Sequence, residues 1–194
     1  MMMLHDLRFR TLSAMLTAVL FVAACSISVT PSPAAKSGIS MVSAITNNPY
    51  KAVLDYIAEC EGTAGAPNGA YAVSLDYGRW LPDGKEQELT KLTIDQIDEL
   101  QTYMLANPMN RARYGNGIGS SAIGKYQIVR ATLRRLKKRL DLTGSELFDE
   151  AMQDRLAAEL VRGRGANTSL GREWASLRGK KLTRAIDLVR QIKP

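Results

Sequence analysis

Glu61 is the carboxylate whose position in the sequence best suits acid–base chemistry. It follows Val53, Leu54, Ile57 and Ala58 at helical spacing, and a step of about 100° per residue puts it in the middle of their apolar stripe. Burial and the negative end of the helix dipole both raise the pKa of such a carboxyl group. A carboxyl group that stays protonated near neutral pH can protonate a glycosidic oxygen. The alternative is a frayed helix end with Glu61 exposed or paired with an arginine.

Asp76 is a second carboxylate that could face the first. It lies in residues 71–84, where β-formers are interrupted by glycine and proline turn signals, so we predict a small β-hairpin there. A hairpin carboxylate opposite the acid could stabilise the oxocarbenium-like charge of glycoside cleavage, or activate water. Asp83 is another candidate for this role. The alternative for Asp76 is a solvated turn residue without a catalytic part.

Two aromatic residues of the same segment, Tyr77 and Trp80, could stack on sugars. Aromatic rings offer flat apolar faces that suit the apolar faces of pyranose rings. The same two rings could instead cover the small β lobe, and the sequence leaves these alternatives open.

The histidine and cysteine content excludes several classes of catalytic site. The single histidine is His5, near the start of the chain in an expected leader, so a processed protein would lack imidazole. Ser-His-Asp and Cys-His nucleophilic sites, histidine-ligated zinc and histidine bases are then excluded. We expect neither a metal nor an organic cofactor, and we interpret Cys60 as a packing residue.

The N-terminal residues are typical of an exported protein. Residues 1–24 combine basic residues with a short apolar run, and Val22-Ala23-Ala24-Cys25 resembles a bacterial lipobox. We expect residues 1–24 to be an export signal, Cys25 to be lipidated, and residues 25–48 to form a tether. The protein would then be periplasmic and membrane-tethered, with one domain at 49–194. Ordinary signal cleavage nearby and an uncleaved anchor are the alternatives.

Capping signals predict where several helices begin and end. Asn48-Pro49 is expected to start the helix that carries Glu61, and Gly62 to stop it. Thr93 to Gln96 have the form of a capping box, and Asp149 is a candidate cap for a later helix.

A strongly basic stretch occupies residues 130–139, opposite a stripe of leucines. A solvated surface is one interpretation of this face. Attraction to an anionic cell wall or membrane is another, in keeping with the net charge of +7. The chain carries no recognised nucleic-acid-binding motif, and export disfavours that class of partner.

Residues 115–127 form a glycine-rich segment, GNGIGSSAIGKYQ, that lacks the spacing of a phosphate-binding loop. Such a backbone could line a sugar-binding wall through its amides. Taken alone, it would be interpreted as a linker.

Three motifs together resemble the phage-type lysozymes of the lambda endolysin kind, a family that includes alphaproteobacterial muramidases. They are AECEGT (58–63), SSAIGKYQI (120–128) and EWASL (173–177), and the similarity spans about residues 52–193. The resemblance implies a lysozyme-like α+β fold, mainly α, with a helical lobe and a small β-hairpin lobe flanking a substrate cleft. It assigns the catalytic acid to Glu61 and implies that Tyr126, Gln127 and Ser121 contact the substrate.

The expected activity is cleavage of the β-1,4 bond between N-acetylmuramic acid and N-acetylglucosamine in peptidoglycan. A muramidase is the leading hypothesis, and a lytic transglycosylase forming 1,6-anhydro products is the alternative. A non-catalytic peptidoglycan-binding protein is a further class. The resemblance and the leader together suggest a monomer that opens the wall locally, for growth or for a secretion machine.

Overall fold

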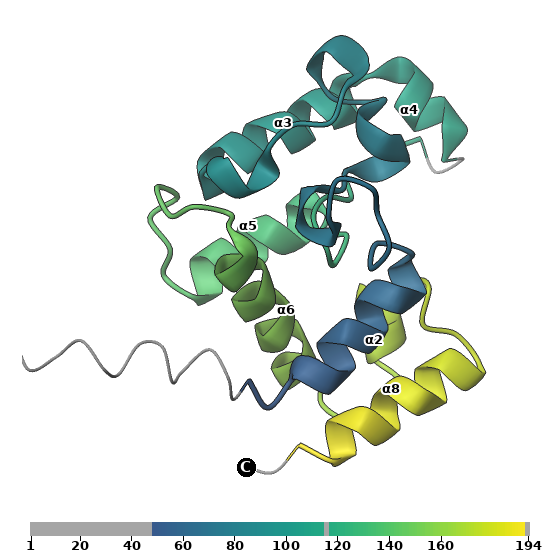
Figure 1. Cartoon of the computed structure of the whole chain (residues 1–194). Coiled ribbons are helices and arrows are strands. Elements are labelled where there is room, and N and C mark those ends of the chain that lie inside the picture. The colour runs from purple at the N-terminus through teal and green to yellow at the C-terminus, as the bar shows by residue number, and fades with distance from the viewer. Residues whose placement is uncertain (1–47, 115–116, 193–194) are drawn as a thin grey trace, which may run out of the picture. The chain divides into compact units, whose positions relative to one another are not determined.

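The computed structural model describes residues 48–114 and 117–192, which all belong to one compact unit (Figure 1). Its helices are α2 (Lys51–Glu61), α3 (Ile94–Ala106), α4 (Pro108–Arg113), α5 (Arg130–Arg139), α6 (Glu150–Arg164), α7 (Leu170–Glu173) and α8 (Lys180–Arg190). Four short 3₁₀ turns lie between α2 and α3: η1 (Ala70–Ala72), η2 (Leu75–Gly78), η3 (Pro82–Gly84) and η4 (Leu89–Lys91). The mainly helical class expected from the sequence is confirmed.

The predicted leader, Cys25 and most of the tether lie outside the described residues. Within the part of the chain that the structure describes, no helix combines the length and apolar character needed to cross a membrane.

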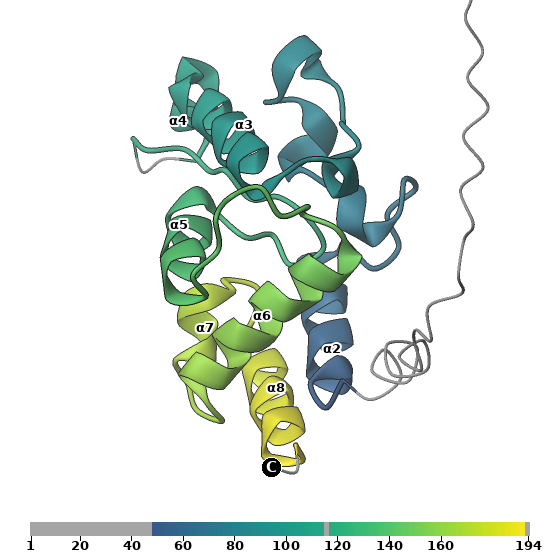
Figure 2. The same cartoon turned by 90° about the vertical axis from the view of Figure 1, so that its left-hand side faces the viewer.

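The main core forms where α2, α6 and α8 pack together. The predicted stripe of α2 (Val53, Leu54, Ile57 and Ala58) is fully buried, and α2 contacts both other helices. Figures 1 and 2 both show α2 and α8 side by side, running in opposite directions. The end of α2, where Glu61 lies, is therefore next to the beginning of α8.

The helix starts predicted from capping residues agree with the structure for α3 and α6 but not for α2. Thr93 and Gln96 form the predicted capping box of α3, and the Asp149 side chain accepts a hydrogen bond from the Met152 amide at the start of α6. The helix start predicted at Asn48-Pro49 is wrong, because α2 begins further along the chain, at Lys51. Asn48 instead accepts a hydrogen bond from the Tyr50 amide and so closes the turn that leads into the helix.

The predicted β-hairpin at residues 71–84 does not form. Asp76, Tyr77 and Asp83 have positive φ angles of 52°, 53° and 61°, and two consecutive left-handed residues cannot continue a strand. The chain also turns back tightly, since a Cβ on Gly78 would lie 2.2 Å from the Glu86 nitrogen.

In place of a sheet, the described residues contain only isolated β-bridges. Two of them join three segments, because Ile123 pairs with both Ser74 and Ile128. A second, smaller core of Trp80, Leu81 and Met104 stabilises the segment that was expected to be the hairpin.

Candidate active site

Glu61 is the last residue of α2, and its side chain reaches across to the segment before α8. Its Oε1 accepts a hydrogen bond from the Ser176 hydroxyl, with 2.5 Å between the oxygens. The helix ends here because Gly62 adopts the left-handed conformation, with φ at 76°. Glu61 is half-buried, whereas Glu59 on the same helix is exposed, as the apolar stripe predicts.

Burial raises the pKa of the Glu61 carboxyl group above its ordinary value. Desolvation is the largest cause, because it penalises the charged form. The hydrogen bond from Ser176 and the positive charge of Lys181 act in the opposite direction and only partly offset it. The raised pKa expected from the sequence is thus confirmed, and no arginine among the described residues pairs with Glu61.

Thr63 joins the end of α2 to the glycine-rich segment. Its hydroxyl lies 2.6 Å from the Lys125 carbonyl oxygen and 3.2 Å from that of Ala58. The three residues after Cys60 therefore have distinct roles. Glu61 presents the carboxyl group, Gly62 ends the helix, and Thr63 fixes that end to Lys125.

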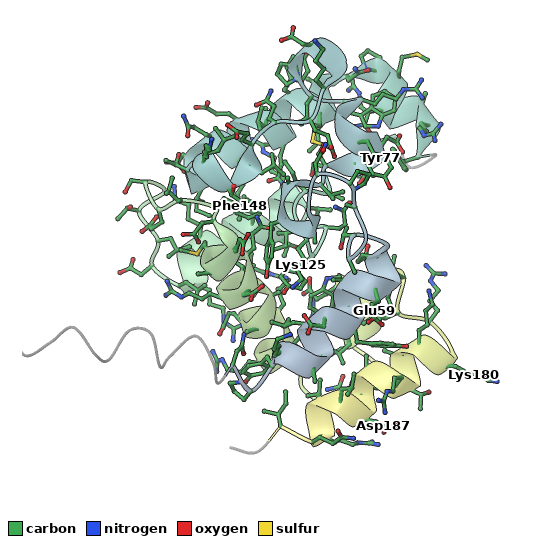
Figure 3. The ribbon with its side chains drawn as sticks, viewed as in Figure 1. Glu59, Tyr77, Lys125, Phe148, Lys180 and Asp187 are labelled. Atoms are coloured by element: carbon green, nitrogen blue, oxygen red, sulfur yellow. The ribbon has the colours of Figure 1, made fainter. Side chains whose placement is uncertain are left out.

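Lys125 is in turn held between α2 and α6 (Figure 3). Its amide donates to the Gln153 side chain of α6 at 2.9 Å, and its Nζ lies 3.4 Å from Asp55 of α2. Its Nζ also donates to the Tyr71 hydroxyl at 3.1 Å. These contacts fix the segment that follows Gly124 against the helix that carries the acid.

Of the three residues that the resemblance implies as substrate contacts, two have structural partners in the interior. The Tyr126 ring is only 1% exposed, and its hydroxyl donates to Asp154 at 2.5 Å. Ser121 is buried, and its hydroxyl oxygen accepts from the Arg130 amide at the start of α5. Gln127 is half-buried, with φ at 49°, and donates to the Gly124 carbonyl oxygen. Gln127 is therefore the member of this set that a sugar could reach.

Asp76 lies in a polar network of its own. Its Oδ2 accepts from the Trp80 indole at 2.8 Å and the Tyr114 hydroxyl at 3.1 Å, and lies 3.1 Å from Nε of Arg113. Across residues 48–114 and 117–192, no hydrogen bond or ion pair joins Asp76 to Glu61. The two carboxyl groups therefore have opposite surroundings, one desolvated and one surrounded by donors.

The two aromatic residues of this segment differ in exposure. Trp80 is only 4% exposed and belongs to the smaller core, so its ring packs inside rather than offering a face to a sugar. Tyr77 is 62% exposed. Only Tyr77 keeps a ring face available for stacking.

Ser176 is the site residue that sequence reasoning missed. It lies within the EWASL motif, so the resemblance marked its segment but not its contact with Glu61. The preceding Trp174 is buried, and its indole donates to the Tyr126 carbonyl oxygen at 3.0 Å. Trp174 thereby fixes the loop that presents Ser176.

The described residues contain no cluster of three or more His, Cys, Asp and Glu side chains that could hold a metal ion. Cys60 is a free thiol, half-buried against the main core, which agrees with a packing role.

Comparison with known proteins gives one family. Neither curated proteins nor solved structures provide a match. A family model described as Endolysin matches residues 51–192, which cover α2 to α8 and include Glu61, Ser176 and the glycine-rich segment. This chain belongs to the Endolysin family and is a peptidoglycan-cleaving glycosidase.

Proposed function

We propose that the protein is a muramidase that cleaves the β-1,4 bond between N-acetylmuramic acid and N-acetylglucosamine, with Glu61 as the general acid. One observation carries this proposal: Glu61 combines a raised pKa with a fixed position, since Ser176 holds one oxygen of its carboxyl group. A protonated carboxyl group can donate to the leaving glycosidic oxygen as the bond breaks.

Asp76 is the proposed partner of the acid. Its carboxyl group lies 3.1 Å from Arg113, and a carboxylate in this place could stabilise an oxocarbenium-like transition state or orient the attacking water. Two carboxyl groups in contrasting surroundings, one desolvated and one held by polar donors, form the kind of pair to which lysozymes give different catalytic roles.

A lytic transglycosylase is the second candidate, and one observation favours it. The three polar partners of Asp76 all meet the same oxygen, Oδ2, and none of them links the carboxylate to Glu61. If Asp76 serves only to hold Arg113, Trp80 and Tyr114 together, water activation lacks a base. The muramic acid 6-hydroxyl would then attack intramolecularly and give a 1,6-anhydro product.

Digestion of purified sacculi tests both levels of the proposal. The full chain is expected to release soluble muropeptides, Glu61→Gln to release none, and Glu59→Gln to behave as wild type. Glu59 is the matched control because it lies on the same helix and is exposed. Full activity of Glu61→Gln would refute the assignment of the acid. Mass spectrometry separates the two reactions, because anhydro products are lighter by one water per cut.

We further propose that Gln127 and Tyr77 contact the glycan. Tyr77 is exposed, and the half-buried Gln127 donates a hydrogen bond to the Gly124 carbonyl oxygen, in the segment that is fixed next to the acid. Export, a lipid on Cys25 and a periplasmic location remain proposals based on the sequence alone. Labelling with radioactive palmitate tests them, because Cys25→Ser should abolish incorporation while Cys60→Ser should not.

A further inference from the structure

Most cations on the basic face of α5 form ion pairs in the structure. Five of its six cations form ion pairs: Arg130 and Arg134 with Asp98, Arg135 with Glu173, Lys137 with Asp95, and Arg139 with Glu159. The cation-rich stretch that stands out in the sequence is therefore mostly engaged within the protein.

Positive charge without such compensation gathers around the start of α8 instead. Residues 174–186 contain four cations and no acid. The cations are Arg178, Lys180, Lys181 and Arg184, which we call the α8 basic patch. All four are exposed, and none forms an ion pair with any residue that the structure describes. Lys180 projects outward from the first turn of α8 (Figure 3).

This arrangement repels itself. Lys180 and Arg184 lie four residues apart on one helix, and Lys181 lies three residues before Arg184. Like charges at these spacings destabilise a helix. An anion bound across the patch would relieve this repulsion, so the patch suits a ligand with more than one negative charge or a row of them.

The α8 basic patch is next to the catalytic acid. Arg178 follows Ser176, which holds Glu61, by two residues, and α2 packs against α8. Lys181 is close enough for its charge to lower the pKa of Glu61, although it makes no ion pair with it. A group bound at the patch would therefore lie close to the bond that Glu61 is proposed to cleave.

We propose that the α8 basic patch binds the carboxylates of the peptide stems on peptidoglycan, and so selects stem-bearing glycan over neutral sugar chains. The inference rests on the proposed function, because it takes the scissile bond to lie at Glu61. The N-acetylated sugars of the glycan are uncharged once a stem is attached, and the carboxylates of the polymer are on the stems. The patch supplies the complementary charge beside the proposed cleavage site at Glu61.

Binding to intact sacculi tests the inference without requiring cleavage. The full chain carrying Glu61→Gln is sedimented with two preparations that differ only in charge. In the first, the free amines of the sacculi are acetylated. In the second, the carboxyl groups are afterwards converted to methylamides. The patch variant is Lys180→Gln/Arg184→Gln, which spares Lys181 because its charge acts on Glu61. The matched control is Lys138→Gln/Arg155→Gln, two exposed cations on α5 and α6.

We expect the patch variant to bind acetylated sacculi about fivefold more weakly than the control, as two exposed ion pairs would allow. On methylamidated sacculi both should bind with the same reduced affinity. Added salt should remove the difference by screening. Equal binding of the two variants to acetylated sacculi would overturn the inference. It would also be overturned if the patch variant bound more weakly than the control by the same factor on acetylated and on methylamidated sacculi.

An anionic membrane is the competing partner, and vesicles containing phosphatidylglycerol provide that arm of the test. If the patch variant lost vesicle binding but kept full binding to acetylated sacculi, the patch would serve the membrane and the inference would be wrong. A failure of the proposed function is seen separately. It would leave the wild-type chain unable to release muropeptides, whatever the binding results.

Discussion

Ser176 donates a hydrogen bond to Glu61 across 115 residues of sequence, and this contact fixes the acid at the end of α2. The hydroxyl group favours the charged form of the carboxyl group, whereas burial favours the neutral form, and burial prevails. Glu61 is thus oriented by a group that only partly offsets the rise in its pKa.

Replacing Ser176 should change the pH profile as well as the rate. A general acid works while protonated, so activity falls as the pH rises through the pKa of Glu61. Ser176→Ala removes a bond that lowers this pKa, and the alkaline limb of kcat should therefore move to higher pH. Loss of orientation should reduce the maximal kcat about tenfold. Ser176→Thr keeps the hydroxyl and should return the alkaline limb of kcat to its wild-type pH. If Ser176→Ala left that limb at the wild-type pH, Ser176 would not lower the pKa of Glu61.

Glu61 should make the fold less stable as the pH rises. The folded-state pKa lies above the unfolded value, so below the unfolded pKa the carboxyl group is protonated in both states and costs nothing. As the pH rises through the folded pKa, the buried group must ionise and stability is lost. Glu61→Gln should therefore unfold at a higher temperature than wild type near neutral pH, with the difference vanishing at about pH 4.

Thermal unfolding across this pH range provides the measurement, and Glu59→Gln provides the comparison. An exposed carboxylate is solvated in both states, so that variant should follow wild type throughout. A constant difference between Glu61→Gln and wild type at every pH would show that the carboxyl group is not desolvated.

Asp76 should matter for catalysis if the enzyme hydrolyses its substrate with two carboxyl groups. Asp76→Asn keeps the shape and can tolerate positive φ, but it removes the charge, so kcat on sacculi should fall about 100-fold. Asp83→Asn is matched to it, since Asp83 also has positive φ in the same segment and is exposed. Near-wild-type turnover of Asp76→Asn would favour the transglycosylase reaction.

Gly124 should be required for the fold of the segment beside the acid. Its φ is 76°, and a Cβ there would lie 2.4 Å from Oε1 of Gln153. Gly124→Ala should therefore lower the free energy of unfolding by about 2–4 kcal/mol, from left-handed strain and overpacking together. Gly65→Ala serves as control because a Cβ there meets nothing within 4 Å. Equal stability of the two variants in urea titrations would refute this reasoning.

The sequence determined the features that depend on neighbours within about one helical turn. The apolar spacing of α2 placed Glu61 on the buried side, Gly62 marked its end, and Thr93 with Gln96 set the start of α3. Caps and amphipathic faces are local, because the atoms that satisfy them are three or four residues away.

The tertiary structure decided which distant groups meet. Packing of α8 against α2 brought Ser176 to Glu61, and packing around Trp80 took its indole away from the surface and towards Asp76. The 71–84 segment had strand-forming residues but lacked a partner strand long enough to form a ladder, so its turn signals prevailed. Likewise, only the fold could show that acids from other helices pair with most cations of α5 while the α8 basic patch has no such partners among the described residues, because charge pairing depends on distances in space rather than along the chain.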